Sequence, residues 1–426
     1  MNNIKCVNIK DGINLYYIPA DKFKAVSVSL YFHRKLKKDE ASKNALLCDV
    51  LSRGCRKYPD DIEVSKKEQE LYGAVVSSDV TRKGEDQMLM FTVRGLAEKY
   101  VEKNVTDSLN LLLDMVFDPY IENDGFKADY VNQEKINLIN DIRAVINDKR
   151  SYSVWRLIQN MCEGDSYGVH ELGTEEDVVL IDEKNLFDHY KKVLKESPVD
   201  IFVTGDVDID GLISVLKERL KDINPETIDR PTCDLYNKDL KNKEVTEEFD
   251  VTQAKLCVGF KTGISYKDEK YPALMVYNGI LGGGAHSKLF NNVREKLSLA
   301  YYASSSLERY KGLMVISSGI EIANKDKALN EIYAQIKDME DGNISDYEFT
   351  ATKLAIINSL KSFGDESAYL KDYYLGQVVG GTMVTLDELI EQIKNVTIDD
   401  VIKVSKFIKP QMVYFLTGKG GDTREI

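Results

Sequence analysis

The sequence predicts an α+β protein made of two copies of one layered unit. Three observations predict this class: a strand pattern near the front recurs at a fixed distance, a pair of helical segments recurs in the same order, and the closing strands also match. A chain of 426 residues also has room for two or three domains. A duplicated unit accounts for both the length and the repeated order.

The first element that recurs is a strand. Residues 26–33 alternate apolar and more polar side chains, which is typical of a strand with one buried face, and residues 256–261 repeat the pattern. Phe32 and Phe260 lie at equivalent positions, 228 residues apart. A nearby acidic turn recurs at an offset of 229 residues, so the two features support each other.

The next elements are helical. Residues 133–153 align with residues 351–370 at an offset of 218, and each segment is predicted to form one long amphipathic helix. In the first segment Leu138, Ile142 and Val145 recur at helical spacing and form an apolar stripe.

The last matching elements are the closing strands, in which Thr204 and Thr417 lie 213 residues apart. The offset shrinks in order from 229 to 213, as expected of two copies that gained or lost a few loop residues. Strands and helices do not alternate strictly, which favours mostly antiparallel sheets with helices on one face over a Rossmann sheet. The charge-dense run 236–250 is interpreted as linker plus first strand of the second copy, with a solvated surface hairpin as the alternative. The expected domains are a first half over 1–222, a linker over 223–240 and a second half over 241–426.

Composition excludes several functions. The net charge of −13 repels phosphate backbones and anionic lipid, so we expect neither nucleic acid nor membrane as a partner. Six cysteines without a CxxC pair favour a reducing cytoplasm. The N-terminal stretch MNNIKCVNIKDG has charges where a signal peptide needs an apolar core, so we expect a cytoplasmic protein without a leader.

The segment GGGAHSKLFNNVREKLSLAYYASSS (282–306) follows a strand and a short helix in the second copy. In this context the chain resembles the insulinase or pitrilysin family of zinc peptidases, which includes the mitochondrial processing peptidases. The resemblance covers nearly the whole chain and implies two halves that face each other as a clamshell, with peptide between them. Within the family the chain is most similar to the inactive peptidase-like proteins of Gram-positive bacteria associated with elongation factor P aminopentanol modification.

The resemblance places the family's zinc motif, HxxEH, on the helix predicted at 42–55. Here Ala45 and Asp49 occupy the two His positions, Cys48 occupies the position of the catalytic Glu, and Asp141 falls at the third ligand. A site built from Cys48, Asp49 and Asp141 is the alternative, but neighbouring helical residues diverge by about 100°. We therefore expect a helix kept for its fold and no metal or other cofactor bound by this chain.

The resemblance assigns substrate contacts to Arg294 and Tyr301, which keep the family's seven-residue spacing in REKLSLAY. A guanidinium and a phenol can donate to the carbonyls of an extended peptide. The alternative is a surface cation and a core aromatic. Gly282, Gly283 and Gly284 lack the spacing of a phosphate loop and are interpreted as a flexible loop that lets substrate backbone approach.

Together these features imply a subunit that is inactive alone and completes the site of a zinc-bearing HxxEH homologue in a heterodimer. Zinc is then expected on the partner subunit, and the complex would cleave peptides. A non-enzymatic peptide-binding or assembly scaffold is the main alternative, a self-sufficient peptidase with an unusual metal site is a third, and a homodimer in isolation stays open.

Overall fold

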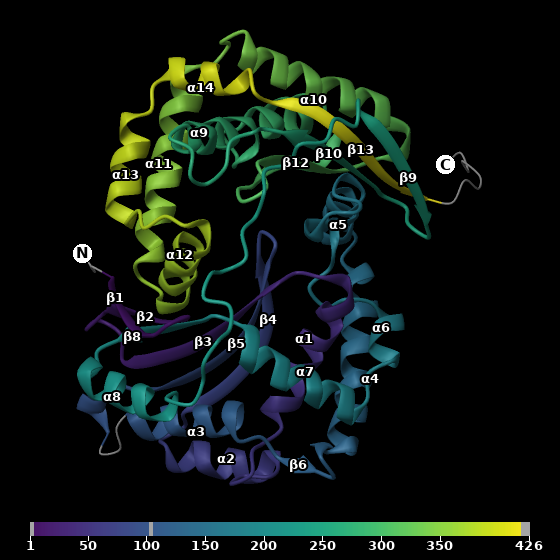
Figure 1. Cartoon of the computed structure of the whole chain (residues 1–426). Helices are drawn as coiled ribbons and strands as arrows, with labels where there is room; N and C mark the ends of the chain where they lie inside the picture. The colour runs from purple at the N-terminus through teal and green to yellow at the C-terminus, as the bar shows by residue number, and fades with distance from the viewer. Residues whose placement is uncertain (1–3, 102–104, 419–426) are drawn as a thin grey trace. The chain divides into compact units, whose positions relative to one another are not determined.

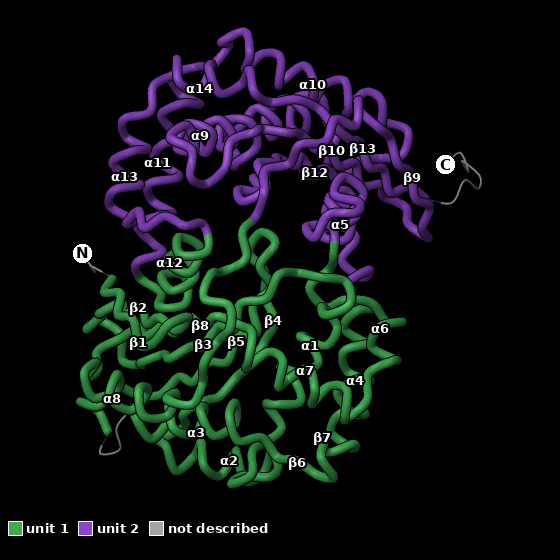
Figure 2. The backbone as a smooth tube through the Cα atoms, viewed as in Figure 1, with its two compact units in different colours: residues 1–143, 169–232, 365–379 green, residues 144–168, 233–364, 380–426 purple. Residues whose placement is uncertain are grey.

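The computed structural model describes residues 4–101 and 105–418 and contains two large sheets with helices packed on them (Figure 1). The chain forms two compact units, shown in Figure 2. Unit 1 consists of residues 1–143, 169–232 and 365–379, and unit 2 of residues 144–168, 233–364 and 380–426. The predicted α+β class is confirmed.

The sheet of unit 1 has six strands. Their spatial order is β1 (Lys5–Lys10), β2 (Ile13–Pro19), β8 (Val199–Gly205), β3 (Ala25–Lys35), β5 (Asp86–Leu96) and β4 (Val75–Lys83). All neighbours pair antiparallel except β2 and β8, which are parallel. The strand β4 lies at one edge of this sheet.

The sheet of unit 2 has five strands. Their order is β11 (Ala300–Glu308), β12 (Leu313–Ile320), β10 (Ala254–Lys261), β13 (Lys409–Gly418) and β9 (Lys243–Phe249). Its one parallel pair, β13 with β9, matches β8 with β2 in unit 1. Phe32 and Phe260 lie on the equivalent strands β3 and β10, and Thr204 and Thr417 lie on β8 and β13. The predicted duplication is confirmed, with β1 as an addition to the first copy.

The helices complete each layer. Unit 1 contains α1 (Lys38–Ser52), α2 (Asp61–Glu70), α3 (Val105–Phe117), α4 (Ala128–Ala144), α6 (Glu175–Val179), α7 (Glu183–Glu196), α8 (Ile209–Arg219) and nearly all of α12 (Ser367–Gly380), with the short strands β6 (Ile121–Glu122) and β7 (Gly125–Phe126). Unit 2 contains α5 (Lys149–Met161), α9 (Tyr271–Gly282), α10 (Lys325–Glu340), α11 (Asp346–Phe363), α13 (Leu386–Asn395), α14 (Ile398–Ser405) and the π-helix η4 (Leu289–Lys296). Single 3₁₀ turns lie at Glu98–Tyr100, Val145–Asn147, Ser166–Gly168 and Ile322–Asn324.

The prediction of one long helix in each copy was wrong, because each segment is broken into two helices. In the first copy α4 ends before a 3₁₀ turn, and Asp148 caps α5 by accepting the backbone N–H groups of Arg150 and Ser151. In the second copy α11 ends at Phe363 and α12 begins at Ser367.

These breaks change how the chain is divided. After the break α5 belongs to unit 2, whereas α12 of the second copy belongs to unit 1 (Figure 2). Each compact unit therefore includes one helix from the other half of the sequence. The linear boundaries at 222 and 240 stay a prediction. Between the two halves of the sequence the chain passes from unit 1 to unit 2 at residues 232 and 233, and α5 and α12 account for its other passages between the units.

The core of unit 1 lies between the sheet and its helices. The apolar side chains of β3 face buried leucines of α1 and α3, among them Leu46, Leu51 and Leu112. In unit 2, Leu157 and Met161 of α5 pack on β10, where Gly259 leaves the space that the Met161 sulfur fills. Among the described residues, no helix combines the length and apolarity that crossing a bilayer requires.

Candidate functional site

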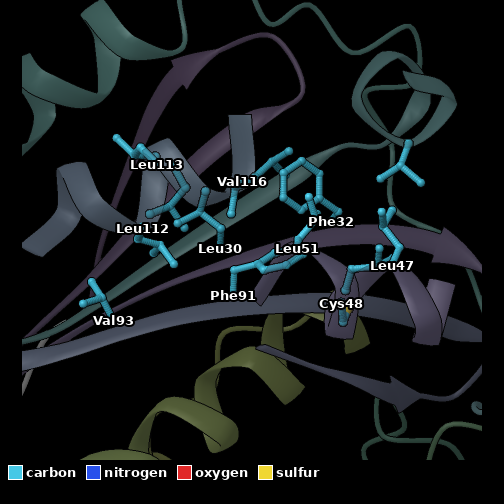
Figure 3. Close-up of a cluster of buried hydrophobic side chains, with 14 of the residues drawn as sticks. Leu30, Phe32, Leu47, Cys48, Leu51, Phe91, Val93, Leu112, Leu113 and Val116 are labelled. Atoms are coloured by element: carbon cyan, nitrogen blue, oxygen red, sulfur yellow. The ribbon is translucent and has the colours of Figure 1, made fainter. Parts of the chain in front are cut away.

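The helix α1 carries Ala45, Cys48 and Asp49, the residues that the sequence resemblance aligns with a zinc motif. Ala45 and Cys48 are buried in the core of unit 1, and Figure 3 shows Cys48 among its apolar neighbours. The Cys48 sulfur lies 3.3 Å from the backbone oxygen of Asp79. Burial raises the pKa of the Cys48 thiol well above its usual value. A neutral thiol packed in the core is a poor metal ligand, since metals bind the thiolate.

Asp49 lies apart from the core and is half-buried beside other carboxylates. Burial, followed by the charges of Glu134, Asp141 and Asp79, raises the pKa of Asp49 to about 7. Nearby, Arg53 places Nη1 3.3 Å from Glu134 Oε1 and 3.1 Å from Asp61 Oδ2. The Arg53 guanidinium therefore pairs with Glu134 and Asp61, and Asp49 keeps its raised pKa.

These residues do not fit a catalytic zinc site. Cys48 and Asp49 meet different surroundings, as their divergence on a helix predicts, and a catalytic zinc needs three protein ligands. Over residues 4–101 and 105–418 no group of three or more His, Cys, Asp or Glu side chains can hold a metal ion. The metal content of the chain itself stays a prediction.

The helix α1 ends shortly before the end of the segment predicted as helix, 42–55. The helix ends at Ser52, and Gly54 adopts φ 151°, where a Cβ would lie 2.5 Å from the backbone oxygen of Tyr58. Glycine is required there, because any side chain would collide with that oxygen.

Sequence reasoning missed a buried polar chain that fixes α1. Asn44 Nδ2 donates to Gln87 Oε1 at 2.8 Å, and its Oδ1 lies 2.7 Å from His189 Nε2. Burial lowers the pKa of His189 to about 4, so the imidazole is neutral and donates from Nε2 to the Asn44 oxygen. These residues lie far apart in sequence, and no spacing pattern could have joined them.

A second network, also missed, holds the sheet of unit 1. His33 Nδ1 lies 2.6 Å from Asp86 Oδ2, and Nε2 lies 3.0 Å from Asp200 Oδ2, with all three side chains buried. Burial alone would lower the pKa of His33, but the two carboxylates raise it to about 9. Arg230, in the segment that leads to unit 2, donates to both Asp200 and Tyr16. The network joins β2, β3, β5 and β8 and is structural.

Two small hollows in unit 1 lie beside these networks. One, of about 250 Å³, is lined by Arg34, Lys37 and Asp229 among others, and one of about 310 Å³ by Lys43 and His189 among others. Both are of mixed charge and favour no particular ligand.

Arg294 and Tyr301 lie in unit 2, on the π-helix η4 and on β11. The side chain of Arg294 is 43% exposed, its guanidinium lies 4.7 Å from the centre of the Phe290 ring, and Nε lies 3.3 Å from Glu295. Tyr301 is 56% exposed, so the core-aromatic alternative is wrong. The register between β11 and β12 shifts at Tyr301, which makes it the extra residue of a bulge on an edge strand. Bulges re-aim side chains in this way beside functional sites.

The glycine run differs from the predicted flexible loop. Gly282 is buried and ends α9, and Gly283 caps it. A Cβ on Gly282 would lie 2.5 Å from the Ser305 nitrogen, and one on Gly283 would lie 2.7 Å from Gly279 Cα. Gly282 therefore lets α9 pack closely on β11, whereas Gly283 lies against the backbone of Gly279 in α9 itself, and Gly284 lies in the turn beyond. Their role toward substrate stays a prediction.

The chain is similar in sequence and structure to known proteins. A model of the Peptidase M16 inactive domain matches residues 181–356. The probable inactive metalloprotease YmfF of Bacillus subtilis (strain 168) is 37% identical over 413 residues, which cover 96% of this chain and 97% of that protein. An uncharacterized zinc protease of the same organism, YmxG, is 26% identical over 71% of this chain and 72% of its own.

Among solved structures, a conserved protein from Enterococcus faecalis V583 superposes with a TM-score of 0.92 and 30% identity, over 99% of this chain and 100% of that one. The nearly full-length identity to YmfF extends the match of the domain model to both copies of the repeat. The chain thus belongs to the peptidase M16 family, among its inactive peptidase-like members.

Proposed function

We propose that this chain is the metal-free subunit of a two-chain peptidase, which binds peptide and completes the site of a zinc-bearing homologue. The observation that carries the proposal is the exposure of Tyr301 at the bulge of an edge strand, with Arg294 on the preceding helix. At the family's metal positions, by contrast, Ala45 and Cys48 have become core residues.

An extended peptide bound along the edge strand β11 would be the substrate that Arg294 and Tyr301 contact. Among the strands that the structure describes, β11 pairs on one side with β12 and has no partner on the other. An extended peptide can bind such an edge through main-chain hydrogen bonds. The Tyr301 hydroxyl would then donate to the carbonyl oxygen under attack, and the Arg294 guanidinium would bind a neighbouring carbonyl. Zinc, bound by the partner subunit, would supply the activated water.

The relatives support a two-chain arrangement. YmfF is described as probably inactive and YmxG as a zinc protease, and both come from one organism. A cell with both kinds of chain has the two components that the proposal requires. A cytoplasmic location and an association with elongation factor P modification stay predictions.

Co-expression with the HxxEH homologue from the same organism tests the proposal. We expect the two chains to purify together and the pair to cleave peptides that neither chain cleaves alone. Full activity of the homologue alone, unchanged by this chain, would contradict it.

A scaffold that binds peptide without hydrolysis is the second candidate. The conversion of α1 into a packing helix, with Arg53 balancing Glu134, favours it because this chain then offers no catalysis of its own. A pair that binds peptide but never cleaves it would identify the scaffold. Elemental analysis of the purified chain tests the third candidate, a self-sufficient peptidase with an unusual metal site. Zinc near one per chain, lost in Cys48→Ala or Asp141→Ala, would establish that site.

A further inference from the structure

The sheet face of unit 2 that α5 covers ends in a group of two cations and an aromatic ring. We propose that Arg150, Lys255 and Tyr302 form a subsite for the carboxylate of an acidic peptide side chain. The inference rests on the proposed function, since it takes the peptide to lie along β11, and it adds a preference for glutamate or aspartate.

The floor of the subsite is a row across three strands. Tyr302 on β11 pairs with Gly319 on β12, which pairs in turn with Lys255 on β10. Gly319 makes the row possible, because a Cβ there would lie 2.5 Å from Cε1 of the Tyr302 ring. The ring therefore lies over the glycine, and the Lys255 ammonium is 5.7 Å from its centre.

Arg150 covers the ring from the start of α5. Its guanidinium lies 4.4 Å from the centre of the Tyr302 ring, and Nη2 donates to Ser304 Oγ at 3.2 Å. A guanidinium that stacks on a ring keeps its other N–H groups in its own plane, where they can bind a carboxylate through two hydrogen bonds. The contact with Ser304 also places this cation directly above the edge strand.

The two cations are not neutralised by direct ion pairs in the part of the chain that the structure describes. The Arg150 hydrogen bond goes to a hydroxyl, and Lys255 Nζ donates to the amide oxygen of Gln253. The nearby carboxylate, Asp148, makes its hydrogen bonds to α5, where it accepts from the backbone N–H and the hydroxyl of Ser151. Burial lowers the pKa of Lys255, the charge of Asp148 opposes this shift, and the neighbouring Arg150 charge adds to it.

A local excess of positive charge stands out on a chain with a net charge of −13. Such a chain repels acidic peptides in general, so two adjacent cations beside the binding strand give local selection rather than general attraction. A carboxylate that binds here would pair with Arg150 and remain within reach of Lys255.

The test uses the full chain and two fluorescently labelled extended peptides, identical except for a central Glu or Gln. Fluorescence anisotropy should give about tenfold tighter binding of the Glu peptide. Arg150→Gln and Lys255→Gln should each reduce this ratio several-fold without weakening the Gln peptide. Lys327→Gln, which removes an exposed lysine of α10 in the same unit, is the matched control and should leave the ratio unchanged.

Inorganic phosphate and succinate serve as competitors and separate a peptide subsite from a general anion site. We expect both to displace the Glu peptide weakly, and displacement by phosphate as strong as by the unlabelled Glu peptide would overturn the proposal. Equal binding of the Glu and Gln peptides, or no binding of either, would also overturn it. Equal binding leaves the proposed function standing, whereas the proposed function fails separately if the two-chain complex shows no cleavage.

Discussion

The two units share one strand order, yet the helix that follows the central strand differs in each. In unit 1, α1 is fixed by buried polar contacts of Asn44. In unit 2, α9 is fixed by glycines, because Gly279 packs on Thr352 and Gly282 packs on β11. The two copies thus share the topology of the layer, whereas the contacts that hold the first helix differ between them.

The two units also differ in whether their candidate site residues are exposed. In unit 1 Ala45 and Cys48 of the first helix are packed in the core, whereas unit 2 exposes Tyr301 at an edge. A chain that only needed a scaffold could have lost both features alike. The asymmetry therefore favours a role in which unit 2 contacts the substrate.

The largest expected effect follows from replacing Tyr301. If its hydroxyl stabilises the developing oxyanion, Tyr301→Phe should lower kcat of the reconstituted pair by ~10²–10³ while the fold and the complex persist. Tyr347→Phe, which removes an exposed phenol of α11, is the control and should leave turnover unchanged. Activity within twofold of wild type for Tyr301→Phe would assign the chain to the scaffold class.

Arg294→Ala tests whether Arg294 contacts the peptide before the reaction. Because Arg294 would also contact the bound peptide before reaction, KM should rise together with a loss in kcat. A fall in kcat alone would place its contact in the transition state only, and an unchanged kcat/KM would remove Arg294 from the site.

A smaller effect is expected where the units differ in packing. Gly282→Ala should destabilise unit 2 by about 2 kcal/mol, because the added methyl meets the Ser305 backbone and α9 must shift. Gly284→Ala is the control, since its Cβ meets only the His286 ring, at 3.3 Å. Urea unfolding followed by circular dichroism measures both, and equal midpoints would show that the glycine run is not a packing device.

The strands were predictable because one buried face leaves a period of two in the sequence. The duplication needed only the order of such segments. The break between α4 and α5 was missed, because the stripe of Leu138, Ile142 and Val145 continues past the end of α4 into the 3₁₀ turn, and the cap at Asp148 gives no signal in that pattern. The partners of His33 could not be predicted either, since Asp86 and Asp200 reach it only through strand pairing.

The carboxylates near α1 give a pH-dependent prediction. The pKa of Asp49 in the fold, about 7, lies above its ordinary value of 3.8, so the folded state retains a proton that the unfolded chain has lost. Stability contributed by this group therefore falls as the pH rises from about 4 to about 7. Asp49→Asn should stabilise unit 1 by about 1–3 kcal/mol at pH 8 and by much less at pH 4.

Thermal unfolding at both pH values measures this effect. Asp141→Asn, which removes one of the charges that raise the Asp49 pKa, should give a smaller gain of the same sign. Destabilisation by Asp49→Asn at pH 8 would mean that the carboxylate holds a cation there, and it would reopen the metal-site alternative.

The smallest expected effect concerns a contact that both copies kept. Lys135 of α4 donates to the backbone oxygens of Val179 and Ile181, and Lys353 of α11 donates to those of Lys394 and Val396. In each copy an ammonium thus holds the last carbonyls of a neighbouring helix, where positive charge is favourable. Lys135→Met and Lys353→Met should each cost about 1 kcal/mol and speed amide exchange at the end of α6 and α13 respectively. Hydrogen exchange resolves the two sites, with the exposed Lys327→Met as control. If only one of the two variants speeds exchange, the lysine of that copy is a structural contact. The equivalent lysine of the other copy then adds no stability to its neighbouring helix.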